Sequence, residues 1–418
     1  MKRFVLLILL LAMALSMTGC LTVTGGNDQP DDIPPEEQHL TADVDETEVW
    51  HRRHDDVWSG QDEPELVSRD FERISGAAAN GMTVGQELLL LDFMDCYYQS
   101  ISQLRVIDPT DLFAEPKEVV YHKTIWHDLC VIRKLSPIDL TMTSYSYALR
   151  CVSITPSEET EGDVDMVLRE SNVTYFAGLN GIPSEQFSIK HTFTLRGVGD
   201  RWLIVRHWSD DNAYYSADYD EETQQDRNFP AITDYIQARR EMSRDEQVSA
   251  TAAHPYDRAA ARQYMLSYVG KRNGDFKAYD DYGGNCMNFG SQVLLSGGIP
   301  MDTSGGYETG WYWYSASQTT LPWVNVGWFL EYAAAEREHG LVAVVNAPYF
   351  TGETGDIITM GVEEPANHTT VILDTIKDEN GAVVDYLLCS NTADLRNFPA
   401  SAYYYTNRQL TKIIGWND

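Results

Sequence analysis

Positive charge is scarce in this chain. Its 418 residues include 31 lysines and arginines against 63 aspartates and glutamates, which gives a formal net charge of −32 and a pI of about 4.5. A surface of this sign repels a phosphate backbone unless a basic patch gathers locally, and the sequence shows no such patch. We therefore expect no nucleic-acid partner.

Cysteines and metal-binding motifs are also few. Six cysteines in 418 residues do not make a disulfide framework, and neither a C-x-x-C pair nor an H-E-x-x-H helix is present. The histidines at 51 and 54 lie in an acidic polar stretch, where a solvated charge run is the better interpretation than a metal site. We expect no metal and no cofactor, so any chemistry must come from isolated side chains.

The apolar run from Phe4 to Met17 is too short to cross a bilayer as a permanent helix. Because it follows two basic residues, it predicts an export signal over residues 1–19. The junction that ends at Cys20 resembles a bacterial lipobox, which implies acylation of this cysteine and attachment to membrane lipid outside the cytoplasm. An ordinary cleaved signal with an incidental cysteine is the alternative.

The composition predicts a globular protein, the length predicts two domains, and the order of helical and strand-like stretches predicts the α+β class. Hydrophobic residues make up 43% of the chain and aromatic residues 11%, enough to fill cores in a chain of this length. Residues 20–64 are rich in Asp, Glu, Pro and Gly and are expected to form an acidic tether. A second acidic stretch, 210–253, is the expected linker between domains at 65–209 and 254–418.

The first domain shows helical periodicity followed by strand-like alternation. Thr83 and Gln86 form a capping-box pattern before a broadly apolar helix. The expected strands then cover 141–154, 164–176, 187–195 and 202–207. This order is similar to the nuclear-transport-factor-like cone, in which a curved antiparallel sheet wraps a long helix, and the similarity is one of architecture alone.

Several histidines and cysteines in this domain are candidate functional residues. His191 and His207 either line a pocket or are hydrogen-bonded histidines of the core or rim, and the second interpretation is the commoner one. Cys96, Cys130 and Cys151 are expected to be buried packing residues. The domain by itself indicates no chemistry.

In the second domain a cysteine stands at the expected start of a helix. Gly283-Gly284 permits a turn, Asn285 can cap, and apolar residues recur at helical spacing from Cys286 to the glycine pair at 297–298. The positive end of the helix dipole favours thiolate over thiol, which is the condition for a nucleophile. A buried structural cysteine is the alternative, because free cysteine is among the most buried residue types.

A histidine and an asparagine follow on two expected strands. His368 opens one strand, and Asn391 ends the next. The Asn380-Gly381 pair between them suits a two-residue hairpin loop, which would place Asn391 opposite Thr370 and diagonal to His368, about 7–8 Å away at the backbone. A three-residue loop would place the two on different faces.

A helix-terminal cysteine, a strand histidine and a third polar residue are the parts that thiol acyl transfer needs, in the order found in papain-like enzymes. Residues 256 to about 415 also resemble the amidase domain of bacterial surface and sporulation-associated proteins, a papain-like group akin to the NlpC/P60 hydrolases. The segments that carry the resemblance are Tyr256-Asp257-Arg258 with Ala260 and Tyr264, Cys286-Met287-Asn288-Phe289 with Ser291-Gln292, Gly297-Gly298-Ile299-Pro300-Met301, Trp311-Tyr312-Trp313-Tyr314, Trp323-Val324-Asn325-Val326, Gly355-Asp356-Ile357-Ile358 and the His368 segment.

The resemblance implies a cysteine hydrolase that cleaves an amide bond in cell-wall peptide or a similar exported substrate. Cys286 would attack the carbonyl carbon, and His368 would accept the thiol proton and later protonate the leaving amine. Asn391 would orient the imidazole. The backbone N–H of Cys286 and the side chain of Tyr282 are the candidate donors of an oxyanion hole.

The chain departs from the family at three positions. The family usually has Asp before the cysteine and Thr after it, where this chain has Asn285 and Met287, and it tends to carry His where Asn391 stands. An amide can orient an imidazole, so activity is expected. The alternatives are a catalytically inactive lipid-anchored binding protein and a structural envelope lipoprotein. The sequence gives no oligomeric state.

The remaining polar and aromatic candidates are expected to pack. Eight aromatic side chains gather between residues 307 and 329, where we expect about two in three to be at least half buried and the rest to be free for ligand stacking. Gln292 is expected to make core or cap contacts, and Cys389 is expected to pack on the face opposite to Ser390.

Overall fold

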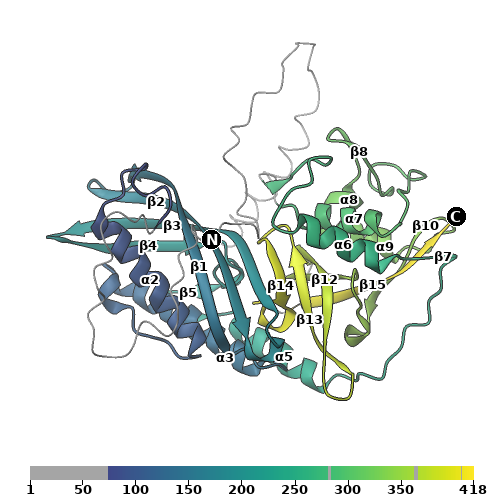
Figure 1. The fold of residues 1–418 in the computed structure, drawn as a ribbon, viewed down its shortest axis with the longest axis horizontal. Helices are drawn as coiled ribbons and strands as arrows, with labels where there is room; N and C mark the ends of the chain where they lie inside the picture. Colours follow the sequence, from purple (N-terminus) through teal and green to yellow (C-terminus); the bar gives the residue numbers. More distant parts are fainter. Residues whose placement is uncertain (1–73, 281–283, 362–365, 406) are drawn as a thin grey trace, which may run out of the picture. The chain divides into compact units, whose positions relative to one another are not determined.

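The computed structural model describes residues 74–280, 284–361, 366–405 and 407–418, which all fall in one compact unit of the chain (Figure 1). The expected signal sequence, Cys20, the tether and Tyr282 lie outside the described residues. Helices and one large antiparallel sheet confirm the expected α+β class. No helix in the described part of the chain is long and apolar enough to cross a membrane.

Two long helices come first in the described chain. Helix α2 (Val84–Ser102) begins at the expected capping box, because the Thr83 hydroxyl accepts from the Gln86 N–H and the Gln86 side chain accepts from the Thr83 N–H. Helix α3 (Pro116–Leu135) was not predicted individually. It starts with proline in its first turn, where no backbone donor is lost.

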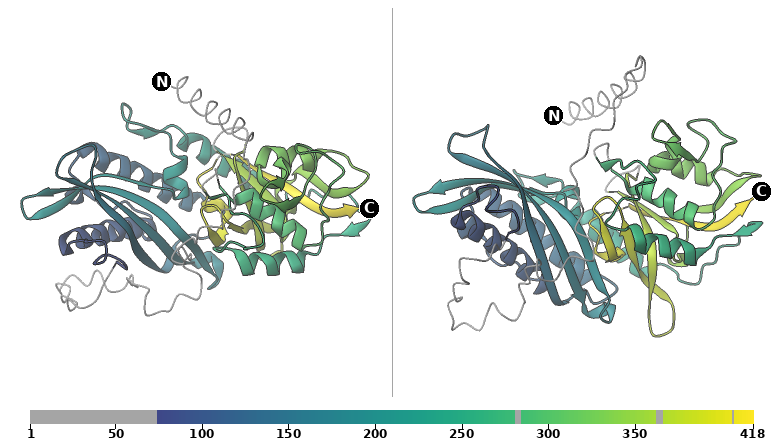
Figure 2. Two further views of the ribbon diagram at one scale, coloured as in Figure 1. Left: turned by 90° about the horizontal axis from the view of Figure 1, so that it is seen from above. Right: turned by 45° about the horizontal axis from the view of Figure 1, so that its top comes forward.

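Four strands then form an antiparallel meander, as the alternation predicted. They are β1 (Met142–Pro156), β2 (Asp163–Phe176), β3 (Pro183–Val198) and β4 (Arg201–Ser209), and they pair in sequence order. Helices α2 and α3 lie against the meander, as two further views show (Figure 2). Phe93, Trp126 and Phe193 pack together between these layers.

The segment expected to link two domains is itself packed. It contains α4 (Asn212–Ser216), the short pair β5 (Tyr219–Asp220) and β6 (Gln225–Asp226), and α5 (Phe229–Glu241). Helix α5 is the longer of the two helices in this segment. Ile232 and Ile236 on its buried face are 0% and 3% exposed, so this helix belongs to the core.

The C-terminal region places short helices on a second part of the sheet. Its helices are α6 (Arg258–Tyr268), α7 (Cys286–Ser296), α8 (Leu321–Val324) and α9 (Val326–Ala334), and a small hairpin joins β8 (Trp313–Ser315) to β9 (Gln318–Thr319). Its strands in the large sheet are β7 (His254–Pro255), β10 (Gly340–Ala347), β11 (Ile357–Gly361), β12 (His368–Lys377), β13 (Val383–Ser390), β14 (Leu395–Pro399) and β15 (Asn407–Asn417).

One sheet runs through both sequence regions, in the order β1-β2-β3-β14-β13-β12-β11-β15-β10. The junction is the pairing of β14 with β3, in which Leu395 faces Gln186 and Arg396 faces Glu185. The two faces of β12 enter different cores because successive side chains alternate. Val371 and Leu373 pack in the core that contains α7, whereas Ile372 packs in the core that contains α2 and α3.

Candidate active site

Helix α7 begins at Cys286, as the sequence predicts. The turn before it depends on Gly284, whose φ of +111° is strained for other residues and whose added Cβ would lie 3.0 Å from the Thr392 hydroxyl. That hydroxyl accepts a hydrogen bond from the Asn285 N–H at 2.5 Å. The Asn285 side chain does not cap the helix, contrary to expectation, and instead accepts from the Tyr279 N–H and from the Asn288 amide.

The Cys286 thiol is buried, with 7% of the residue exposed. The backbone N–H groups of Thr369, Met287 and Cys286 itself favour the thiolate and lower the pKa of the thiol, but burial outweighs them and raises it. Burial thus opposes the thiolate that the helix dipole favours. The sulfur nevertheless lies beside the backbone of Thr369, the residue that follows His368.

His368 is the first residue of β12 and is 7% exposed. Burial lowers the pKa of its imidazole from 6.5 to about 4, so the ring is neutral at physiological pH. Its Nε2 lies 3.5 Å from the Tyr403 hydroxyl. The negative charge of a Cys286 thiolate would raise the pKa values of Tyr403 and Tyr405, and both rings lie about 6 Å from the His368 ring, at 6.0 and 6.1 Å. The sulfur and the imidazole thus share the same tyrosine neighbours.

The hairpin register differs from the prediction. Asp378 and Ala382 are hydrogen-bonded to each other across a three-residue loop, 379–381. The strand pairing after this loop has irregularities in its register, the last of which lies between Ile372 and Asp374. Val371 consequently pairs with Cys389. Continued by two residues, this register places Asn391 level with Thr369 rather than with Thr370. On this register Asn391, which follows the end of β13, would share a face with Thr369 and not with His368, the separation expected of a three-residue loop.

The Asn391 side chain holds a different part of the chain. Its Oδ1 accepts from the Gly270 N–H at 3.1 Å, and its Nδ2 donates to the carbonyls of Tyr268 and Lys271 at 3.1 and 2.7 Å. These bonds fix the loop that follows α6. Thr392 holds the turn before Cys286, so Asn391 and Thr392 together support the backbone around this cysteine.

Two residues of the site lack a specific sequence signal. Thr392 follows Asn391 directly, but only the fold brings its hydroxyl to the Asn285 N–H. Tyr403 lies in the run Tyr403-Tyr404-Tyr405 just before β15, and its position next to His368 depends on the order of strands in the sheet. The run of three consecutive tyrosines is the only hint of this role that the sequence offers.

The other signature residues of the region are structural. Asp257 caps α6 by accepting from the N–H groups of Ala259 and Ala260. Arg258 donates to the fully buried carboxylate of Asp356 at 2.8 Å, and burial raises the pKa of that carboxyl group. Tyr256 packs against Gly297 and Gly355. These contacts join α6 to the end of α7 and to the start of β11.

The expected packing roles are confirmed for the aromatic stretch and for Gln292. The indole N–H groups of Trp311 and Trp323 donate to Ser291 and Asn288 of α7, and Gln292 accepts from the Tyr264 hydroxyl at 2.6 Å. Of the eight aromatic residues, only Tyr307 and Tyr314 are exposed, at 60% each. Cys96, Cys130, Cys151 and Cys389 are buried, as expected.

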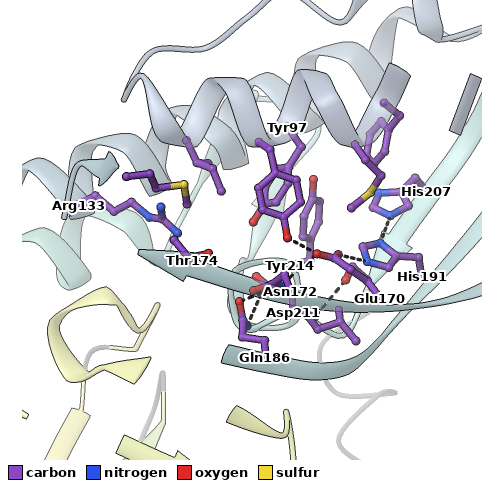
Figure 3. Close-up of a pocket in the computed structure, with 17 residues that line it drawn as sticks. Tyr97, Arg133, Glu170, Asn172, Thr174, Gln186, His191, His207, Asp211 and Tyr214 are labelled. Carbon is purple, nitrogen blue, oxygen red and sulfur yellow. Dashed lines mark hydrogen bonds and ion pairs between the residues drawn. The ribbon is translucent and has the colours of Figure 1, made fainter. Parts of the chain in front are cut away.

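Both interpretations of His191 and His207 apply. They line a cavity between α2 and the meander, drawn in Figure 3, and they are hydrogen-bonded within it. His191 Nε2 lies 2.8 Å from Glu170, and its Nδ1 lies 3.0 Å from His207 Nε2. Burial lowers the pKa of His207. The wall around these histidines combines aromatic residues such as Phe93 and Tyr98 with polar residues such as Asn172 and Gln186. Within the described residues, no group of three or more His, Cys, Asp or Glu side chains is placed to hold a metal.

Comparison with known proteins concerns the C-terminal region. Residues 255–414 match the protein family described as "Putative amidase domain". The region is amidase-like. This match confirms the predicted amidase character for less than half of the chain and indicates an enzyme of the hydrolase type.

A stretch of the chain is also similar to another protein. Over 145 residues the chain is 32% identical to the "Uncharacterized protein YhbB" of Bacillus subtilis (strain 168). The similar stretch covers 34% of this chain and 43% of that protein, so the chain spans less than half the length of its relative. No solved structure matches the chain.

Proposed function

We propose that this protein is a surface-anchored cysteine hydrolase that cleaves an amide bond in cell-wall peptide or a similar exported substrate. The observation that carries the proposal is the position of the Cys286 sulfur, at the N-terminus of α7 and beside the Thr369 N–H, within a region that matches an amidase family. His368, one residue before Thr369, supplies a neutral imidazole as proton acceptor.

The proposed reaction starts from a neutral thiol and a neutral imidazole. The proton of Cys286 moves to His368 as the sulfur attacks the amide carbonyl carbon, and the C–N bond breaks as His368 returns the proton to the leaving amine. Water then attacks the thioester, gives a proton to His368 and releases the carboxylic acid, and the thiol regains its proton. The backbone N–H of Cys286 is a proposed oxyanion donor, and Tyr282 remains the proposed second one.

In this proposal Tyr403 is the residue that orients the imidazole. Its hydroxyl lies 3.5 Å from His368 Nε2. Asn391, the third residue of the Cys-His-Asn mechanism expected from the sequence, has its amide bonded to the backbone of residues 268–271. We assign it a positioning role, exerted through that loop and not through direct contact with His368.

The same proposal includes a papain-like architecture, two domains at 65–209 and 254–418, and a lipid anchor at Cys20. An anchored enzyme of strongly negative charge would act on the outer side of the membrane. Metabolic labelling with a radioactive fatty acid tests the anchor, because label should enter the wild-type chain and be absent from Cys20→Ala. Equal labelling of both chains would remove the anchor from the proposal.

Hydrolysis of purified muropeptides by the full chain, followed by mass spectrometry of the products, tests the activity. We expect the wild type to cleave an amide bond and Cys286→Ala to be inactive. Cys389→Ala is the matched control, because Cys389 is also buried and packs in the same core. Binding of muropeptides by the wild type with no cleavage would favour the inactive binding protein instead.

A further inference from the structure

A cavity away from Cys286 collects arginines in a chain that is otherwise strongly acidic. It has a volume of about 370 Å³ including its mouth, and α5, the short 3-10 helix η5 (Tyr349–Thr351), β13 and β15 contribute to its walls. Its charged lining residues are Arg239, Arg240, Arg244, Arg408 and Asp385. Four positive charges and one negative charge sum to +3, whereas the chain as a whole carries −32.

Two of these arginines are buried or half-buried and have unused donors. Arg408 is 6% exposed, and its Nε has no hydrogen-bond partner. Arg239 is half-buried, and its Nη1 also has none. Their Nη2 atoms donate to backbone carbonyls, Arg408 to Tyr403 and Arg239 to Arg408, at 2.6 Å each. A carbonyl satisfies a donor but leaves the positive charge uncompensated, which is costly in a buried site.

The carboxylate in the cavity does not balance this charge. Asp385 accepts from the Ser401 hydroxyl at 2.5 Å and from the N–H groups of Ser401 and Tyr386. Burial raises its pKa, and the positive charge of Arg408 acts in the opposite direction. Asp385 is therefore occupied by neutral donors of its own surroundings, and the cavity remains positive.

Aromatic rings orient the guanidinium groups. The Arg239 Cζ lies 3.3 Å from the centroid of Tyr349, and the Arg244 Cζ lies 4.8 Å from that of Phe350. Stacking covers the flat faces of the guanidinium groups and leaves their N–H edges as donors. Arg240 and Arg244 are exposed and add charge at the mouth.

We propose that this cavity binds a phosphate group. Guanidinium edges match the oxygens of phosphate, and several converging arginines suit a dianion better than the single charge of a carboxylate. The geometry accommodates a soluble phosphate or phosphate ester and equally the phosphate of a lipid headgroup that enters through the mouth. The cavity shares no lining residue with the proposed amide-hydrolysis site.

Isothermal titration calorimetry of the full chain with inorganic phosphate, near neutral pH and at constant ionic strength, tests the proposal. We expect saturable binding of one phosphate per chain that Arg239→Gln weakens about tenfold, the loss expected for one charged hydrogen-bonding group. Arg240→Gln/Arg244→Gln should also weaken it, and because both residues are exposed this variant tests the site even if buried arginines are needed for folding. Arg206→Gln, an exposed arginine of β4 paired with Glu159, is the control.

Competition identifies the source of the phosphate. If the ligand is soluble, glycerol 3-phosphate should displace inorganic phosphate and phosphatidylglycerol vesicles should not. If it is a lipid headgroup, those vesicles should displace phosphate from the wild type, and phosphatidylcholine vesicles of equal amount should displace less. The absence of saturable phosphate binding, or equal affinity in the wild type and both arginine variants, overturns the proposal.

Discussion

The Tyr403 hydroxyl lies 3.5 Å from Nε2 of His368, and both residues are buried, at 0% and 7% exposure. The Tyr403 ring is itself held by Phe398 and by a stacked contact with Tyr405. A fixed hydroxyl beside an imidazole restrains the rotation of the ring. This contact supports an orienting role for Tyr403 in the proposed hydrolase.

Tyr403→Phe should therefore lower kcat for amide hydrolysis by about tenfold and leave KM nearly unchanged, since a residue that orients the general base contributes mainly to the chemical step. Steady-state kinetics on a muropeptide substrate measures both constants. Tyr405→Phe is the control, because its ring lies at a similar distance from His368, 6.1 Å. Equal kcat for Tyr403→Phe and the wild type would contradict the orienting role.

Asn391→Ala is expected to act on stability. The substitution leaves the Gly270 N–H and the carbonyls of Tyr268 and Lys271 without their partner, which should lower the free energy of unfolding by about 1–3 kcal/mol. Urea unfolding measures this change, and Asn380→Ala in the exposed hairpin loop serves as the control. A large loss of kcat at unchanged stability would instead support direct orientation of His368 by Asn391.

Alkylation of Cys286 by iodoacetamide should be slow near neutral pH and should accelerate as the pH rises above the ordinary thiol pKa of about 8.5. Burial raises the pKa of this thiol, so little thiolate is present at neutral pH in the free protein. Mass spectrometry of the labelled peptide follows the rate, with Cys389 as a buried comparison. Rapid labelling of Cys286 below neutral pH would show that a thiolate–imidazolium pair forms in the free protein after all.

Arg258→Met should destabilise the fold strongly. It removes the guanidinium that lies 2.8 Å from the fully buried Asp356 carboxylate, and loss of one partner of a buried ion pair costs about 3–5 kcal/mol. Arg262→Met on the same helix removes only a half-exposed pair with Asp374 at 3.8 Å, for which less than about 1 kcal/mol is expected. Urea unfolding of both variants gives the comparison, and equal effects would refute a structural role specific to Arg258.

His122 should contribute to unfolding in mild acid. It is fully buried, its Nδ1 lies 2.9 Å from the Tyr214 hydroxyl, and burial lowers the pKa of its imidazole from 6.5 to about 3. Between these pH values the unfolded chain binds a proton that the folded chain does not, so stability falls as pH falls, by up to about 1.4 kcal/mol per pH unit for this group. The free energy of unfolding, measured from neutral to mildly acidic pH, should fall less steeply in His122→Gln. Equal slopes would exclude this contribution.

The local features of the chain followed from the sequence. Thr83 and Gln86 cap α2 as a capping box, Cys286 begins α7, and the alternating stretches form the strands of an antiparallel meander. These features depend on interactions between residues close in sequence, such as side-chain bonds to the first turn of a helix or the period of apolar residues. They could be predicted because the neighbours that determine them are adjacent in the chain.

The tertiary fold determines which residues come together in the candidate site. Irregular pairing between Ile372 and Asp374 moves Asn391 to the face away from His368, while strand order brings Tyr403 to the imidazole. The junction of β3 with β14 and the gathering of Arg239 with Arg408 likewise join residues that are distant in sequence. Local sequence patterns do not encode these contacts, because a shift of one residue in a strand leaves every local propensity unchanged but reverses which side chains meet.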